Sequence, residues 1–161
     1  MRTIGIDPGL ASGAIAYIQN GRPVEWMVLP RLGKKEHLDW SSIGAWIQDR
    51  GPVDLAVLEK VSSRPGEGVR SVFNFGGAFH GLQATLQLLG VPYTLATPQA
   101  WKKVVLAGLD TEAKDSSVAY VRKRWPSVDL RPTPRSRKDS DNLADAICIA
   151  AYAASQLTPI P

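Results

Sequence analysis

The first thirty residues are arranged as three strand-like segments joined by two tight turns. Apolar residues alternate with other residues over 3–7, 13–18 and 24–29, and the turn-forming pairs Pro8-Gly9 and Asn20-Gly21 separate these segments. An Asn-Gly pair between two alternating apolar segments is a strong signal for a β-hairpin. The sequence therefore predicts that the chain begins with an antiparallel, three-stranded meander.

The rest of the chain alternates between helix and strand patterns. Residues 53–59 are almost continuously apolar, which is typical of a central strand that is buried on both faces and runs parallel to the first strand. Helical spacing of apolar residues and flanking Gly and Pro predict the other elements. These are helices over 37–50, 71–89, 98–107, 111–125 and 140–156, and a strand over 92–96. This order predicts an α/β fold, in which helices flank both faces of a mixed five-stranded sheet.

Length and composition predict one soluble domain. A chain of 161 residues, 44% of them hydrophobic, is long enough for one core and too short for two domains of ordinary size, so we expect a single domain over 1–161. The one cysteine, Cys148, lies in the apolar run 146–150, which predicts a buried thiol in a reducing cytoplasm. No stretch approaches the ~18 consecutive apolar residues of a membrane span, and the N-terminus lacks the apolar core of a signal peptide.

Four acidic residues fall where three predicted elements could bring them together. Asp7 ends the first strand, Glu59 ends the apolar strand, and Asp141 and Asp145 lie on the last helix. Carboxylates brought close repel one another, and bound cations offset that repulsion. Oxygen ligands without a Cys/His cluster favour Mg²⁺ or Mn²⁺ over zinc, so we interpret the set as a metal-dependent nuclease site. For Asp7 a turn-capping role stays open, and for Glu59 a strand-end charge that simply reaches solvent.

Basic residues concentrate just before the last helix. The net charge is +4, and residues 122–138 contain seven Lys or Arg residues against the single acid Asp129: Arg122, Lys123, Arg124, Arg131, Arg135, Arg137 and Lys138. Two prolines within 131–135 predict a helix end followed by a basic loop. The loop could be ordinary solvated surface. It leads directly into the acidic helix, however, so a polyanion drawn to it would be delivered to the metals.

Three motifs resemble, in order and separation, those of the RuvC family of Holliday junction resolvases, and small bacteriophage members are the nearest kind. The motifs are Gly5-Ile-Asp7-Pro-Gly9, Leu58-Glu59-Lys60-Val61 and Leu143-Ala-Asp145-Ala146. Pro98-Gln-Ala-Trp-Lys-Lys103 and Lys114 stand where the family has basic residues. In one departure, Asn142 occupies a position where the family commonly has Asp or His. The resemblance implies an RNase H-like fold.

The resemblance further implies a homodimeric crossover junction endodeoxyribonuclease that binds a four-way DNA junction and nicks two opposing strands symmetrically. Two Mg²⁺ or Mn²⁺ ions per active site would carry out the hydrolysis, with Asp7 bridging the ions and Glu59 and Asp145 flanking them. Lys114 would neutralise charge on the scissile phosphate, although a solvated lysine is an equal alternative. We expect Asp141, four residues before Asp145, to supply the fourth carboxylate and Asn142 to make a neutral contact.

The residues expected to contact DNA lie in several segments: Arg64, Arg70, Phe73, Phe75, Lys102, Lys103, Lys114, Arg135, Arg137 and Lys138. Phe73 and Phe75 could stack on bases at the junction centre, and a core role is their alternative. Trp101 is expected to anchor packing. The helix over 71–89 carries a stripe of small and apolar residues that predicts a twofold dimer: Phe73, Gly77, Gly81, Ala84 and Leu88.

Other function classes compete with the resolvase interpretation. The segment from Gly5 to Gly13 also suits the phosphate-binding hairpin of actin-like kinases and ATPases, but those proteins surround the nucleotide with two such domains. A second competitor is another RNase H-like nuclease that acts on branched DNA or on RNA/DNA hybrids. A binding protein with a decayed active site is disfavoured, because all the motif acids are present.

Overall fold

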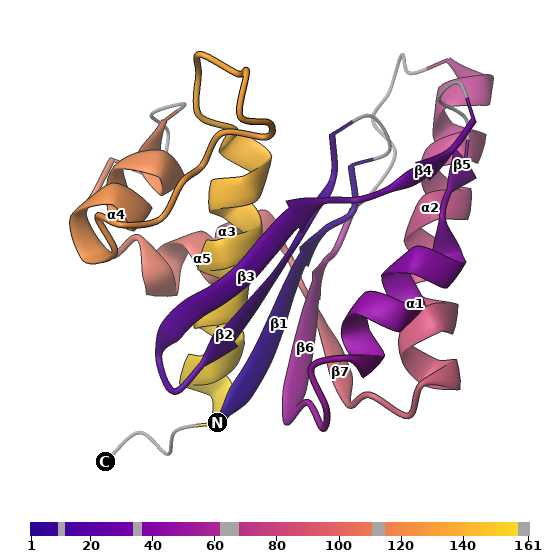
Figure 1. The fold of residues 1–161 in the computed structure, drawn as a ribbon, viewed down its shortest axis with the longest axis horizontal. Helices are drawn as coiled ribbons and strands as arrows, with labels where there is room; N and C mark the ends of the chain where they lie inside the picture. The colour runs from indigo at the N-terminus through magenta and orange to yellow at the C-terminus, as the bar shows by residue number, and fades with distance from the viewer. Residues whose placement is uncertain (10–11, 34–36, 62–67, 111–114, 158–161) are drawn as a thin grey trace.

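A five-stranded sheet forms the centre of the computed structural model, which describes residues 1–9, 12–33, 37–61, 68–110 and 115–157 (Figure 1). The spatial order of the strands is β3-β2-β1-β6-β7. The first three strands are antiparallel to one another, and β6 and β7 run parallel to β1, so the expected mixed sheet and opening meander are confirmed. The strand bounds are β1 (Arg2–Asp7), β2 (Ala14–Gln19), β3 (Arg22–Val28), β6 (Leu55–Glu59) and β7 (Tyr93–Ala96).

The turn between β2 and β3 confirms the hairpin that the Asn-Gly pair predicts. Asn20 and Gly21 have φ angles of 51° and 77°. Two consecutive residues with positive φ form the turn whose twist matches that of the flanking strands, and Asn and Gly adopt this conformation at the lowest cost. The local sequence thus sets the register of this hairpin.

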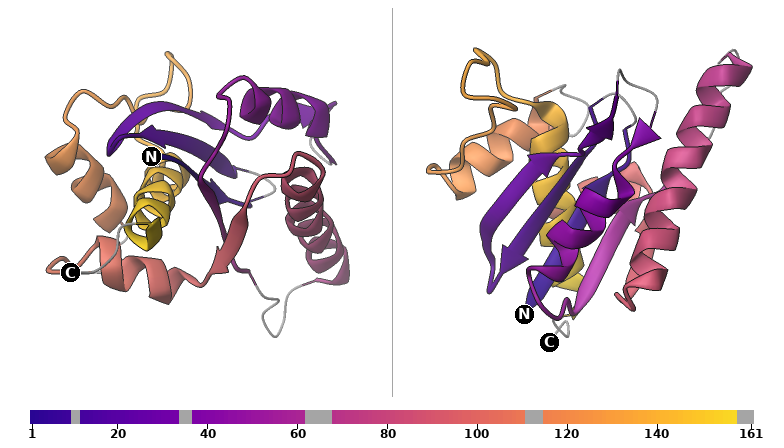
Figure 2. Two further views of the ribbon diagram at one scale, coloured as in Figure 1. Left: turned by 90° about the horizontal axis from the view of Figure 1, so that it is seen from below. Right: turned by 45° about the vertical axis from the view of Figure 1, so that its right-hand side comes forward.

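Helices cover both faces of the sheet. Figure 2 shows α1 (Trp40–Gln48) and α2 (Val69–Leu88) on one side, and three helices on the other: α3 (Pro98–Val105), α4 (Ser116–Arg124) and α5 (Asp141–Leu157). Successive side chains along a strand point to opposite faces of the sheet, so alternate strand residues belong to two separate cores, one on each face. The expected packing of helices on both faces is therefore confirmed. The expected burial of the free Cys148 is also confirmed, because this residue of α5 lies in the core between that helix and the sheet.

A glycine in β1 allows α5 to lie directly against the sheet. A Cβ atom at Gly5 would stand 2.2 Å from both the Ala146 carbonyl oxygen and the Ala150 amide nitrogen. Two residues earlier on the same face of β1, the Thr3 hydroxyl donates a 2.9 Å hydrogen bond to the Ala150 carbonyl. This close approach fixes the position of α5 along β1, and with it the position of every side chain that α5 presents there.

Some element boundaries differ from the sequence prediction. The helix expected from residue 37 begins at Trp40, because the Asp39 side chain accepts a hydrogen bond from the Ser42 amide and caps the helix. Residues His37–Leu38 instead form a short strand, β5, that pairs with β4 (Arg31–Leu32). The first residues of the helix expected over 111–125 lie outside the described residues. None of the helices in the described ranges is long and apolar enough to cross a bilayer.

Candidate active site

Asp7 and Glu59 end two neighbouring parallel strands at the same edge of the sheet. Ile6 of β1 lies opposite Leu58 of β6 in the parallel register, so the two acids that follow them stand at the same level. The ends of β1 and β6 lie at the end of the molecule where α5 begins (Figure 1). The carboxyl ends of parallel strands are where α/β folds place their sites.

Asp145 joins these two acids from α5. It lies one turn into the helix and one residue before Ala146, the residue that contacts Gly5. Its carboxylate is close enough to influence the ionisation of both Asp7 and Glu59. Three of the four predicted acids therefore meet at one site, although they come from positions up to 138 residues apart in the sequence.

The three acids share a partly desolvated, negatively charged environment. Burial raises the pKa of Asp7 to about 7, and repulsion from Glu59 and Asp145 adds to the rise. Burial likewise raises the pKa of Glu59 and of Asp145. The positive charge of Lys102 on α3 opposes the pKa rise of Glu59 and of Asp145. A group that loses water and faces like charges favours its neutral form unless a cation compensates.

The donors fit a hard divalent cation in chemistry. In the described ranges, no group of three or more His, Cys, Asp or Glu side chains is close enough to form a ready-made metal centre. The three acids nevertheless supply several carboxylate oxygens in one partly buried place. Burial is the main cause of their raised pKa values, and repulsion from neighbouring acids adds to the rise; a bound cation would offset both effects. The site has the donor set of a magnesium or manganese site without the closed arrangement of a preformed one.

Asp141 and Asn142 lie at the start of α5 and have different surroundings. Burial raises the pKa of Asp145, and the negative charge of Asp141 adds to that rise. The Asn142 side-chain nitrogen donates hydrogen bonds to the carbonyl and the hydroxyl of Ser12. Asn142 thus ties the start of α5 to the segment between β1 and β2, whereas the charge of Asp141 acts on Asp145.

Two of the three acids also accept hydrogen bonds from the protein, and a hydroxyl stands beside the third; these neighbours were not expected from the sequence. The Gly9 amide donates to Asp7 at 3.3 Å and the Trp101 indole to Glu59 at 2.7 Å, and the Ser117 hydroxyl opposes the rise in the pKa of Asp145. Trp101 and Ser117 are buried residues of α3 and α4. Burial and packing of Trp101 are as expected, but no sequence spacing indicates that a tryptophan 42 residues away meets Glu59.

The described residues that are expected to contact DNA lie on α2, on α3 and in the segment before α5. Lys102 is half-buried beside the acids, and Lys103 and Arg70 are exposed. Phe73 is 80% exposed, so a core role for it in a single chain is wrong, whereas Phe75 is half-buried. Arg64 and Lys114 lie outside the described residues.

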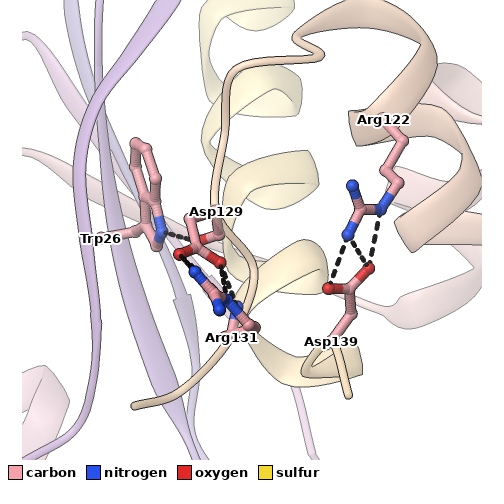
Figure 3. A network of polar contacts seen from close by, with 5 residues as sticks. All are labelled: Trp26, Arg122, Asp129, Arg131 and Asp139. Carbon is pink, nitrogen blue, oxygen red and sulfur yellow. Dashed lines mark hydrogen bonds and ion pairs between the residues drawn. The ribbon is translucent and has the colours of Figure 1, made fainter. Parts of the chain in front are cut away.

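The basic loop before α5 is joined to β3 at one end by a hydrogen bond and to α4 at the other by an ion pair (Figure 3). At the start, Arg131 pairs with Asp129, whose backbone carbonyl accepts a 2.7 Å hydrogen bond from the Trp26 indole. At the end, Arg122 of α4 makes two 2.8 Å hydrogen bonds to Asp139. Between these anchors lie three exposed side chains that form no ion pair within the described part of the chain: Arg135, Arg137 and Lys138.

The outer face of α2 carries an exposed apolar surface. Val69, Phe73 and Leu88 are each at least 80% exposed. The predicted dimer stripe on this helix is wrong at Gly81, because a Cβ atom there would stand 2.5 Å from the Trp40 ring; Gly81 therefore packs inside the chain. The other predicted members of the stripe are exposed: Phe73, Gly77, Ala84 and Leu88.

Comparison with known proteins reveals similarity to one group. No protein-family model matches the chain. Proteins described as crossover junction endodeoxyribonuclease RuvC, from Corynebacterium efficiens and Corynebacterium glutamicum, are each 28% identical to it, over 92% of this chain and 68% of their own. These matches confirm the expected resemblance of this sequence to RuvC proteins.

Solved structures agree in fold. The structure of Thermus thermophilus RuvC in complex with a Holliday junction substrate matches with a TM-score of 0.67 and 20% identity, over 96% of this chain and 92% of that one. The Fowlpox virus resolvase, in complex with substrate Holliday junction DNA, matches with a TM-score of 0.61 and 13% identity, over 98% and 100% of the two chains. The chain therefore has the RNase H-like fold of RuvC, as its sequence predicts.

Proposed function

We propose that this chain is a RuvC-like Holliday junction resolvase, an endonuclease that cuts the phosphodiester backbone of four-way DNA junctions. The observation that supports it most is the convergence of Asp7, Glu59 and Asp145 at one edge of a RuvC-like sheet. All of 1–161 would act as one nuclease domain. We include in the proposal that it is a small bacteriophage-type member acting in the bacterial cytoplasm, a reducing compartment that suits the free thiol of Cys148.

The acids would hold the cations that the reaction needs. Asp7, Glu59 and Asp145 would bind two Mg²⁺ or Mn²⁺ ions, with Asp7 shared between the ions and Asp141 completing the set. Such ions stabilise the attacking and leaving oxygens of an in-line displacement at phosphorus. Hydrolysis consumes one water for each phosphodiester bond and leaves a 5′-phosphate and a 3′-hydroxyl. Lys114 would offset the negative charge that develops on the scissile phosphate.

The basic loop would supply much of the affinity for DNA. Arg135, Arg137 and Lys138 are exposed and form no ion pair within the described residues, and the Trp26–Asp129 hydrogen bond and the Arg122–Asp139 ion pair hold the loop that carries them. Contacts of this kind neutralise phosphates and carry no base specificity. The loop would therefore bind the phosphate backbone of any DNA, and junction selectivity would come from the relative placement of two active sites.

Two such sites require a homodimer, which we propose forms through the outer face of α2. Exposed apolar side chains on one helix face cost free energy in a monomer, and a twofold partner would bury them. Phe73 and Phe75 lie in the first turns of this helix, so they would stand near the centre of the bound junction, where bases can stack on aromatic rings.

The substrate choice can be tested with labelled four-way junction, linear duplex and RNA/DNA hybrid, each incubated with Mg²⁺, with Mn²⁺ and without metal. We expect metal-dependent, symmetric nicking of the junction alone. Preferred cleavage of the hybrid would indicate another RNase H-like nuclease. Binding of ATP at millimolar Mg²⁺, measured separately, would indicate an actin-like kinase or ATPase fragment. Asp7→Asn and Glu59→Gln should each abolish cleavage while changing junction binding by no more than a few fold. Asp49→Asn, at an exposed position after α1, should leave both cleavage and binding unchanged.

The fourth ligand can be tested with a second pair of variants. Asp141→Asn should abolish cleavage or raise the metal concentration that cleavage requires, because it removes the carboxylate nearest to Asp145 on the helix. Asn142→Ala should reduce cleavage much less, since Asn142 contacts Ser12. If Asn142→Ala is inactive and Asp141→Asn cuts normally, the fourth ligand is Asn142 and the assignment of Asp141 is wrong.

A further inference from the structure

Trp101 has an unusual combination of contacts for a core tryptophan. It lies on α3, is completely buried, and packs among residues of the core beneath α5. Its indole nitrogen donates a 2.7 Å hydrogen bond to Oε2 of Glu59 at the end of β6. A buried indole N–H needs an acceptor, but a backbone carbonyl satisfies that need at no electrostatic cost. Here the acceptor is one of the three converging acids.

The face of the same indole ring is occupied by a cation. The Nζ atom of Lys102 lies 5.5 Å from the Trp101 ring centroid, within the range of a cation–π contact. The Lys102 ammonium is also close enough to Glu59 and Asp145 to stabilise their charged forms. Through its N–H and its ring face, one rigid side chain thus touches both an acid of the candidate site and the lysine beside that site.

We propose that Trp101 is a positioning residue, which holds the Glu59 carboxylate in the orientation that receives a divalent cation; this rests on the proposed metal-dependent nuclease function. A carboxylate at the end of a strand can rotate about its side-chain bonds, and binding of a cation restricts these rotations at a cost in conformational entropy. The Trp101 hydrogen bond occupies one carboxylate oxygen and fixes the plane of the group. The other oxygen then remains available to a cation without further ordering of the group.

The chain contains a matched control for this interaction. Trp46 is also a largely buried tryptophan whose indole donates to a glutamate, Glu25, at 3.2 Å. Trp46 belongs to the other core, on the opposite side of the sheet, whereas Glu25 is an exposed residue of β3 that is additionally paired with Arg50. A Trp→Phe substitution removes the same N–H from either site and keeps most of the ring, so the two variants differ in which glutamate loses its donor.

The first test measures binding of Mn²⁺ by titration calorimetry, without DNA, to the full chain and to the two variants. Trp101→Phe should bind Mn²⁺ about 10- to 100-fold more weakly than the natural chain, the range found when a hydrogen bond to a metal ligand is removed. Trp46→Phe should bind as the natural chain does. Cleavage by Trp101→Phe should recover at higher Mn²⁺ concentration, with junction affinity in the absence of metal unchanged.

The second test follows the tryptophan indole N–H signals by NMR and does not depend on Trp101→Phe being well folded. Glu59→Gln should shift the Trp101 indole signal and leave that of Trp46 in place, because the charge of the acceptor is lost only at Trp101. Addition of Mg²⁺ to the natural chain should shift the same signal. An unchanged Trp101 signal in Glu59→Gln would overturn the inference.

The possible failures are distinguishable. If the natural chain binds Mn²⁺ and folded Trp101→Phe binds it equally well, Trp101 only fills the core and the positioning role is wrong, while the metal-dependent function stands. If the natural chain neither binds Mn²⁺ nor cleaves the junction with it, the proposed function itself fails, and the positioning role with it.

Discussion

Replacing Asp7 by Asn should stabilise the metal-free protein at alkaline pH, although it removes a residue of the candidate site. Burial and the repulsion of Glu59 and Asp145 raise the pKa of Asp7 from 3.8 to about 7 in the folded state. The folded protein therefore holds a proton on Asp7 that the unfolded chain has released. Ionised Asp7 opposes folding increasingly as the pH rises from about 4 to about 7, and fully above that.

The magnitude follows from the size of that shift. A change of about three pKa units at 1.36 kcal/mol per unit sets a ceiling of about 4 kcal/mol above neutral pH. Asp7 retains some contact with solvent, and the repulsion is shared with two other acids that can also take up a proton. We therefore expect Asp7→Asn to raise the free energy of unfolding by ~1–2 kcal/mol at about pH 8. For a domain of this size that corresponds to roughly 2–8 °C in melting temperature.

The assay is thermal or urea denaturation of both proteins in a metal chelator at about pH 8 and about pH 4.5, with Asp49→Asn as the control for removal of an exposed charge. The advantage of Asp7→Asn should shrink at the lower pH, where Asp7 is largely protonated in the folded state. Added Mg²⁺ should stabilise the natural chain more than the variant. An Asp7→Asn protein that is no more stable than the natural chain at about pH 8 in chelator would refute the electrostatic reasoning.

Three further predictions concern packing, DNA affinity and assembly. Gly5→Ala should destabilise the fold by ~1–3 kcal/mol or more in urea denaturation, because its Cβ would stand 2.2 Å from backbone atoms of α5, whereas Gly76→Ala, with open space around it, should be neutral or stabilising. Arg135→Gln should lower junction affinity and make the slope of log K against log salt less steep by about one. Arg131→Gln should change the slope less, because the natural Arg131 already pairs with Asp129; equal changes in slope for the two variants would contradict this. Phe73→Asp should convert a dimer into the 17.4 kDa monomer in sedimentation, and a natural chain that is monomeric and fully active would exclude the α2 interface.

The sequence by itself determined the elements whose signals are local. Alternating apolar residues and the Asn20-Gly21 turn specify the opening meander, because strand periodicity and positive φ are properties of neighbouring residues. The apolar run before Glu59 indicated a central strand for the same reason. Local signals also identified the acids, since Asp7 and Glu59 stand at strand ends and Asp145 sits in an apolar helix. The short β4–β5 pairing escaped prediction, because two-residue strands carry no periodicity.

Only the tertiary structure decided how these residues meet. Asp7 and Glu59 stand at one level because of the parallel register between β1 and β6, which no residue in either strand specifies alone. Asp145 reaches them because the missing side chain of Gly5 lets α5 lie against β1. The Trp101 hydrogen bond to Glu59 joins α3 to β6 through the packed core. Contacts between elements distant in sequence depend on how whole faces pack, and that information is distributed over both cores rather than carried by any one motif.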